Sequence, residues 1–171
     1  MEMGKVLTGF LRGWPGAVSR SRDDVIVSLK NADQNPVAFG APVFLKASST
    51  GVVNFTAGTT TSEQFAGFAV RVPDKTPDAY PDALGAGTAS DRGAFRPGDP
   101  VDVLVRGSVI VPIATTSARI GDKVYIRLSD GKLVTAAGDS GTTAELPGVT
   151  VRGARDSGGC CEVTVTKRNL I

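Results

Sequence analysis

The chain has 171 residues, which is enough for one domain with or without arms. Its formal net charge of +2 is too small to indicate binding to nucleic acid, and no apolar run approaches the ~20 residues of a membrane-spanning helix. It contains no histidine, which removes the usual general base and the commonest metal ligand.

The composition favours strands and turns. The chain has 21 glycines and 10 prolines, and helix-forming residues in periodic runs are nearly absent. Such a balance is typical of an all-β fold. Its two cysteines, Cys160 and Cys161, are adjacent, so in a strand they would face opposite sides and could not pair with each other.

Residues 1–24 are predicted to form an extended arm, because glycine and proline interrupt them too often for a long strand. Between Lys5 and Arg22 the segment carries four basic residues and no acid. Two interpretations stay open: Trp14 folds back on its own domain, or the arm docks on a neighbouring subunit by strand addition or anchor residues.

Residues 25–72 are predicted to form a first β unit, which starts with the strand Val25–Leu29. Residues 73–100 form the longest irregular stretch, with Tyr80 as an aromatic anchor. A connection of this length is uncommon inside a compact domain. We expect either a mobile surface loop or a second docking arm that orders against a partner.

Residues 101–112 contain the strongest apolar run. Five valines of one parity would share one face of a continuous strand, namely Val101, Val103, Val105, Val109 and Val111. Gly107 interrupts the run, and we expect it to allow a bend through which the strand passes from one sheet to another.

Residues 121–133 are predicted to form a strand, a tight turn and a strand, and Asp130-Gly131 predicts a type I′ turn. Residues 40–53 repeat this pattern: Gly40 and Gly67 recur 81 positions later as Gly121 and Gly148. Gly51 and Gly131 are 80 apart, which predicts a second hairpin one residue shorter. We interpret this as an internal duplication; the alternative is chance similarity among glycine-rich strands.

The predicted fold is therefore all-β, a jelly-roll or barrel-like sandwich built from a duplicated β unit. An N-terminal arm of residues 1–24 precedes a single β domain, residues 25–171. This domain comprises a first unit of about residues 25–72, the long loop 73–100 and a second unit of about residues 101–171.

The sequence offers no catalytic constellation. Serines and lysines are scattered, and Asp23-Asp24 has the character of solvated turn residues. Gly85-Ala86-Gly87 lacks the strand–helix context of a phosphate-binding loop, and Cys160-Cys161 has no second pair of zinc ligands. We therefore expect no enzyme activity, no cofactor and no metal.

Several motifs in order resemble a known family. They are Gly-Phe-x-Arg-Gly-x-Pro-Gly-x-x-Ser-Arg from Gly9 to Arg20, Asn35-Pro36-Val37, Gly40-Ala41-Pro42-Val43, the run from Phe95 to Val109 with Pro97-Gly98-Asp99-Pro100, and Gly121-Asp122-Lys123-Val124-Tyr125. Together they are similar to the structural cement, or head decoration, proteins of tailed bacteriophages. The resemblance implies a β-rich barrel or jelly roll that forms homodimers or homotrimers. It also implies a protein made in the host cytoplasm that sits on the outer surface of the capsid and bridges neighbouring major capsid proteins.

If the chain acts in this way, aromatic and arginine residues of the two irregular segments are the expected contacts with partners, since such residues dominate interface energetics. They are Phe10, Arg12, Trp14, Arg20, Arg22 and Tyr80. No contact with nucleic acid or membrane is expected. A carbohydrate-binding jelly roll is the alternative, although one Trp and two Tyr offer little aromatic platform. A small β-rich hydrolase is disfavoured by the missing histidine.

Overall fold

The computed structural model describes residues 12–46, 51–54, 64–72 and 93–166, apart from the side chains of residues 21, 22, 53 and 54. All regular structure in these ranges is β, as the composition predicts, and they contain no helix that could cross a membrane. The strands are β1 Val18–Asn31, β2 Val37–Ala38, β3 Pro42–Leu45, β4 Gly51–Asn54, β5 Gln64–Ala69, β6 Ala94–Phe95, β7 Pro100–Pro112, β8 Lys123–Arg127, β9 Leu133–Val134, β10 Thr143–Gly153 and β11 Cys160–Val165.

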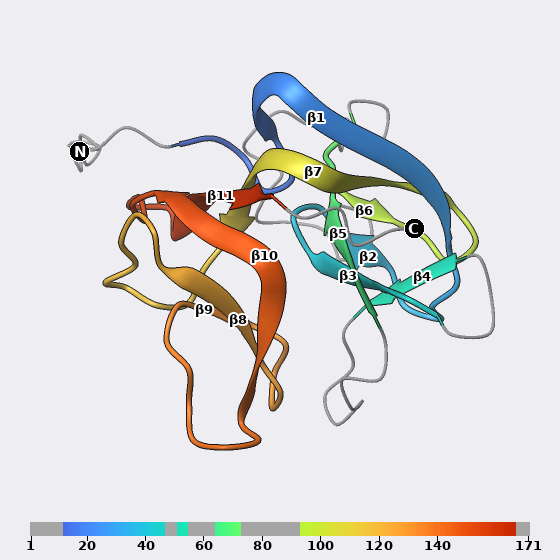
Figure 1. Ribbon diagram of the computed structural model, residues 1–171. Helices are drawn as coiled ribbons and strands as arrows, with labels where there is room; N and C mark the ends of the chain where they lie inside the picture. The colour runs from blue at the N-terminus through green and yellow to red at the C-terminus, as the bar shows by residue number, and fades with distance from the viewer. Residues whose placement is uncertain (1–11, 47–50, 55–63, 73–92, 167–171) are drawn as a thin grey trace, which may run out of the picture.

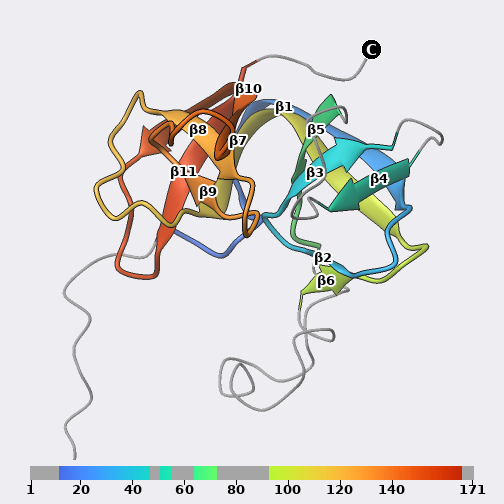
Figure 2. The ribbon, with the colours of Figure 1, turned by 90° about the horizontal axis from the view of Figure 1, so that it is seen from below.

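The strands form two barrel-like units that share β7 (Figure 1). In the first unit the order is β1-β4-β3-β5-β7, and pairing of β7 with β1 closes the sheet. The short β2–β6 pair lies at one end of this unit (Figure 2). In the second unit the order is β7-β11-β10-β8-β9. Here Ala114 N–H, just after β7, donates to Leu133 O of β9 and brings the two margins of the sheet together.

The backbone hydrogen bonds repeat between the units, which confirms the predicted duplication. Gly40 N–H donates to Ala69 O at 2.8 Å, and Gly121 N–H donates to Val151 O at 2.8 Å. The reciprocal bonds from Ala69 to Ala41 and from Val151 to Asp122 recur in the same way. Each residue is matched by one 81 or 82 positions later, so the two units are copies of one β module. Chance similarity among glycine-rich strands would not reproduce these bonds.

The structure corrects the two hairpin details. Among the described residues only glycines have positive φ, so Asp130 does not, and the turn is not type I′. Instead Gly131, with φ of 69°, ends a four-residue loop in which Gly131 N–H donates to Arg127 O. Arg127 N–H donates to Lys132 O just as Lys46 N–H donates to Gly51 O. Gly51 therefore matches Lys132, and the second hairpin is not shorter.

β7 carries the core from one unit to the other. Val101, Val103 and Val105 face the interior of the first unit, whereas Val109 and Val111 belong to the core of the second. The five valines are all buried, but they do not share one face, because the strand bends at Gly107. The bend thus occurs where the sequence predicts it, but β7 passes from one unit to the other within a single nine-stranded sheet and not from one sheet to another.

Aromatic side chains fill the contact between the units. Phe44, Phe65 and Phe68 point away from the first unit's interior and join the same buried cluster as Val163 and Ile126 of the second unit. Their rings meet edge to face, with centroids 5.9 Å apart for Phe44 and Phe65 and 5.3 Å for Phe65 and Phe68. This packing joins the two units through one continuous apolar core.

The N-terminal boundary differs from the prediction. β1 begins at Val18, so the last seven residues assigned to the arm, 18–24, belong to a strand that pairs with β7. Residues 21–24 form a wide bulge opposite Gly107, since Arg20 pairs with Ser108 and Val25 with Arg106. The bulge explains why the pattern there does not read as a strand. Residues 1–11 of the predicted arm and residues 73–92 of the long loop lie outside the described residues.

Candidate docking surface

Residues 12–17 connect the two units, because they run from the β10–β11 turn to the seam beside β7. Arg12 N–H donates to Asp156 Oδ2 at 2.8 Å, and Arg12 Nε donates to Ala154 O at 2.5 Å. Burial raises the pKa of Asp156, but N–H donors of Arg12, Cys160 and Gly158 and the charge of Arg12 outweigh it and lower the pKa overall. Asp156 is therefore a charged clamp for this segment.

Trp14 is the exposed anchor of the same segment. The residue is 50% exposed, and the Arg71 guanidinium lies 5.2 Å from the ring centroid, a cation–π distance. Two residues later Gly16 donates to Ile110 O at 2.8 Å and accepts from Arg71 N–H at 2.8 Å. Trp14 thus rests against its own domain and is still half exposed to solvent.

Arg20 forms an ion pair within the chain. Its Nε donates to Glu162 Oε1 at 2.7 Å, and Ser19 Oγ donates to the same oxygen at 2.9 Å. The Glu162 side chain is only 5% exposed, so this ion pair fastens the start of β1 to β11. The exposed part of the Arg20 side chain is what remains available to a partner.

The structure brings three of the six predicted contact residues onto the chain's own surface: Arg12, Trp14 and Arg20. Phe10 and Tyr80 lie outside the described residues, as does the side chain of Arg22. Sequence reasoning missed Arg71, which stacks on Trp14. It also missed two exposed apolar residues, Ile26 at 45% and Ile120 at 71% exposure. No spacing in the sequence points to Arg71 or Ile26, whereas the repeat offset of 81 gives Ile120 the position in the second unit that the buried Phe39 holds in the first.

A buried carboxyl lies where β1 and β7 cross. Both oxygens of Asp24 are buried, and neither has a hydrogen-bond partner of normal geometry. A Cβ built at Gly107 would overlap Asp24 Oδ1, so the carboxyl rests directly on that glycine. Burial and the neighbouring Asp23 raise the pKa of Asp24, and the nearby Ser108 N–H offsets this only in part. Asp24 is not the solvated turn residue that the sequence predicts.

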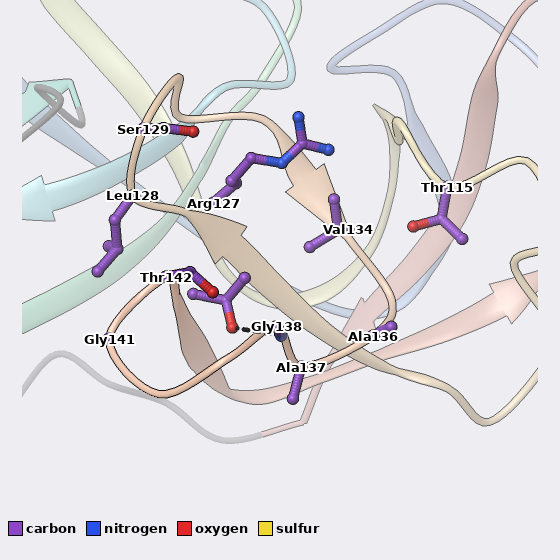
Figure 3. A pocket seen from close by; sticks show the side chains of 11 residues that line it. Thr115, Arg127, Leu128, Ser129, Val134, Ala136, Ala137, Gly138, Gly141 and Thr142 are labelled. Carbon is purple, nitrogen blue, oxygen red and sulfur yellow. Dashed lines mark hydrogen bonds between the residues drawn. The ribbon is translucent and has the colours of Figure 1, made fainter.

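The second unit has an open depression of about 520 Å³ between the β8–β9 loop and residues 135–143 (Figure 3). Its lining contains Thr115, Arg127, Leu128, Ser129, Val134, Ala136, Ala137, Gly138, Gly141, Thr142 and Thr143. None is aromatic, and the charged Arg127 is already paired with Asp130 at 3.1 Å. The depression therefore lacks the stacking platform expected of a carbohydrate site.

The described part of the chain also holds no cluster of three or more Cys, Asp or Glu residues that could bind a metal. Both cysteines are free and buried, and burial raises the pKa of Cys161 to about 11. A thiol of this kind is a packing group and not a nucleophile.

Comparison with known proteins gives one family and two structures. The model of a family described as "Structural cement protein (E217 gp24/Pam3 gp6)" matches residues 7–166. The fold is similar to a chain in the capsid of Myoviridae phage XM1, with a TM-score of 0.69 and 17% identity over 98% of this chain and 99% of that chain. It also matches the head fibre gp8.5 N base of bacteriophage phi29, with a TM-score of 0.42 and 13% identity over 86% and 99% of the two chains. A search of curated proteins found no match.

Proposed function

The chain belongs to the phage structural cement protein family, and on that premise we propose that it binds the outer surface of a phage head as a homo-oligomer and bridges neighbouring major capsid proteins. Its role is structural, and the bridging holds adjacent subunits of the shell together. No step of this role requires catalysis, a cofactor or a metal.

The proposal rests on the way in which Trp14 is held at the surface of the free protein. A half-exposed tryptophan stacked under Arg71 lies on a segment that Asp156 holds to the second unit and Ile110 holds to the seam. Because its surroundings are fixed in the free protein, Trp14 loses little conformational entropy when a partner covers it. Trp and Arg are the residues most often found at interface hot spots.

Bridging of this kind needs only an interface of the usual size. A specific interface buries about 1,600 Å² in total, and any ligand that binds only the assembled shell stabilises it by mass action. The fold similarity to a chain in the phage XM1 capsid supports a place in the shell for a protein of this shape.

Co-sedimentation with assembled shells and with dissociated capsid protein tests the proposal. We expect binding to shells only, and a shell that resists heat better when the protein is bound. Light scattering of the free protein should give a dimer or trimer. A monomer at all concentrations would contradict the proposed homo-oligomer. Equal binding to dissociated capsid protein would contradict the cement role.

Trp14→Ala tests the anchor, with Ile26→Ala as a matched control of similar exposure on the outer face of β1. A hot-spot residue contributes about 2 kcal/mol or more, so Trp14→Ala should weaken shell binding by roughly 30-fold. Ile26→Ala should leave it unchanged. Equal binding of the two variants would show that Trp14 is not the anchor. Deletion of the arm must stop at residue 11, because Arg12 bonds to Asp156 and Ala154, Gly16 bonds to Ile110, and residues 18–24 are part of β1.

A further inference from the structure

The duplication leaves one apolar position of the second unit exposed. Ile120 is 71% exposed, whereas Phe39, which stands 81 positions earlier in the first unit, is only 8% exposed. The turns that contain the two residues carry the matching backbone hydrogen bonds of Gly40 and Gly121. The difference in exposure therefore comes from what covers each position and not from a different local backbone.

In the first unit the cover is β6, which lies beside β2 at one end of the unit (Figure 2). Phe39 N–H donates to Gly93 O at 3.0 Å, and Ala94 lies opposite Ala38. The ring of Phe95 packs edge to face on Phe39, with centroids 5.4 Å apart. The cover is thus a short antiparallel strand that accepts one backbone bond and places a large apolar side chain two residues later.

In the second unit the matching backbone is residues 118–120. Among the described residues no strand pairs with this segment, and none accepts a hydrogen bond from Ile120 N–H. The connection from β10 to β11 takes only residues 154–159, where the first unit has the long segment that contains β6. The described part of the second unit therefore presents a backbone donor and an exposed isoleucine at an edge without a cover of its own.

The same edge carries an excess of positive charge. Arg119 is exposed, and so is Arg152, which follows the residue of β10 that accepts the backbone bond of this turn. Within the described ranges neither arginine side chain forms an ion pair, whereas Lys123 is paired with Glu145 at 3.0 Å. Asp122 is the acid of the turn, and its Oδ2 accepts the Arg119 N–H at 2.8 Å. A segment that carries a carboxylate complements this edge.

Charge also disfavours a second copy of the same edge as the cover. If two copies of residues 118–120 paired antiparallel about a two-fold axis, Arg119 of one copy would lie opposite Arg119 of the other. Like charges directly opposite each other in a strand pair are destabilising. The cover is therefore more suitably supplied by a chain of different sequence.

We propose that residues 118–120 receive a short extended segment of the major capsid protein, as β2 receives β6. One residue of that segment accepts Ile120 N–H, the next places a carboxylate opposite Arg119, and the third covers Ile120 with a large apolar side chain. In such strand addition the main-chain bonds give affinity and the side chains give specificity. The inference rests on the proposed function and adds to it a docking surface and the chemistry of the capsid segment.

Ile120→Ala tests the apolar contact, with Ile26→Ala, the other exposed isoleucine, as the matched control. We expect Ile120→Ala to weaken co-sedimentation with assembled shells by roughly tenfold, because the complex buries a side chain that the free protein exposes. Ile26→Ala should bind as the unaltered protein does. If the unaltered protein does not bind shells, the proposed function fails and this inference with it. If it binds and Ile120→Ala binds equally well, only the docking surface is wrong.

Substitution of Arg119 tests the charge of the capsid segment. Arg119→Glu should weaken shell binding by roughly tenfold, and Arg119→Lys should restore it to within about threefold of the unaltered protein. Since Arg119 is exposed, both variants should melt at the temperature of the unaltered protein. Equal binding of the Glu and Lys variants would overturn the carboxylate opposite Arg119.

Amide hydrogen exchange tests the backbone pairing without any substitution. Ile120 N–H should exchange at least roughly tenfold more slowly in the shell-bound protein than in the free protein. Phe39 N–H is the internal control, because its bond to Gly93 O should protect it equally in both. Unchanged exchange of Ile120 N–H on bound shells would overturn the pairing. Protection in the free protein would also overturn it: a dependence on concentration would identify a second copy as the cover, and protection at every concentration would identify the chain itself.

Discussion

Replacing Gly107 by Ala tests how the two units are joined. Gly107 has φ of 124°, which costs an alanine about 1–2 kcal/mol. The new Cβ would also overlap the Asp24 carboxyl from the bulge of β1, and overpacking of this kind costs about 1–3 kcal/mol. We expect Gly107→Ala to lower the free energy of unfolding by about 2–5 kcal/mol, a large share of a domain's stability.

The chain supplies the controls. Gly98 also has a positive φ, 85°, but a Cβ there meets nothing within 4 Å, so Gly98→Ala carries the backbone cost alone. Urea unfolding of both variants, with and without Asp24→Ala, separates the two contributions. Asp24→Ala should recover most of the steric cost at Gly107 and none of the cost at Gly98. If Gly107→Ala and Gly98→Ala are equally destabilising, Asp24 does not rest on Gly107 and the description of the crossing is wrong.

Asp24→Asn should raise the free energy of unfolding at pH 7 by about 1 kcal/mol, because burial disfavours the charged carboxylate. The gain should fade as the pH falls towards 3.8, and melting temperatures of both proteins at pH 7 and pH 4 check this. Asp156→Asn should lower the free energy of unfolding at pH 7, because the lowered pKa of Asp156 contributes stability above pH 3.8 that is lost as the pH falls. A loss at pH 7 that persists unchanged at pH 3 would contradict the bond between Asp156 and Arg12. Neither cysteine should react with a thiol reagent at pH 8 until the protein is unfolded, and labelling of the native protein would show that Cys161 is not buried with a pKa of about 11. Calorimetry should show a single transition, because the units share β7 and an apolar cluster; two transitions would mean that the units fold separately.

The fold class and the duplication could be predicted because they depend on local chemistry that repeats. Gly40 and Gly121 occupy turns whose backbone bonds are the same in both units, and repeated strands keep their apolar residues in register. The bend at Gly107 was also readable, since a glycine in the middle of a valine run signals a change of direction. These features need no knowledge of what packs against what.

The bulge in β1 and the partners of the arginines could not be predicted from local sequence. The bulge at residues 21–24 hides the first half of β1, because its pairing with β7 is set by a distant Gly107 and not by local pattern. The arginines of the arm were predicted as partner contacts because arginine is frequent at interface hot spots. The sequence gives no sign that Arg12 and Arg20 also bond to Asp156 and Glu162, which stand more than 140 positions away. Pairings at this separation depend on the closed fold, which composition does not encode.

The sharing of β7 bears directly on the proposed role. A protein that holds a joint in a shell must deform less than the joint itself. To move one unit against the other, the chain would have to break the ladder between β1 and β7 and expose the cluster of Phe44, Phe65 and Phe68. Trp14 lies on the segment that spans this seam, so a pull on the exposed anchor is resisted by both units at once. Two separate modules joined by a linker would present the same residues without that resistance, which is a physical reason for the two copies to share a strand.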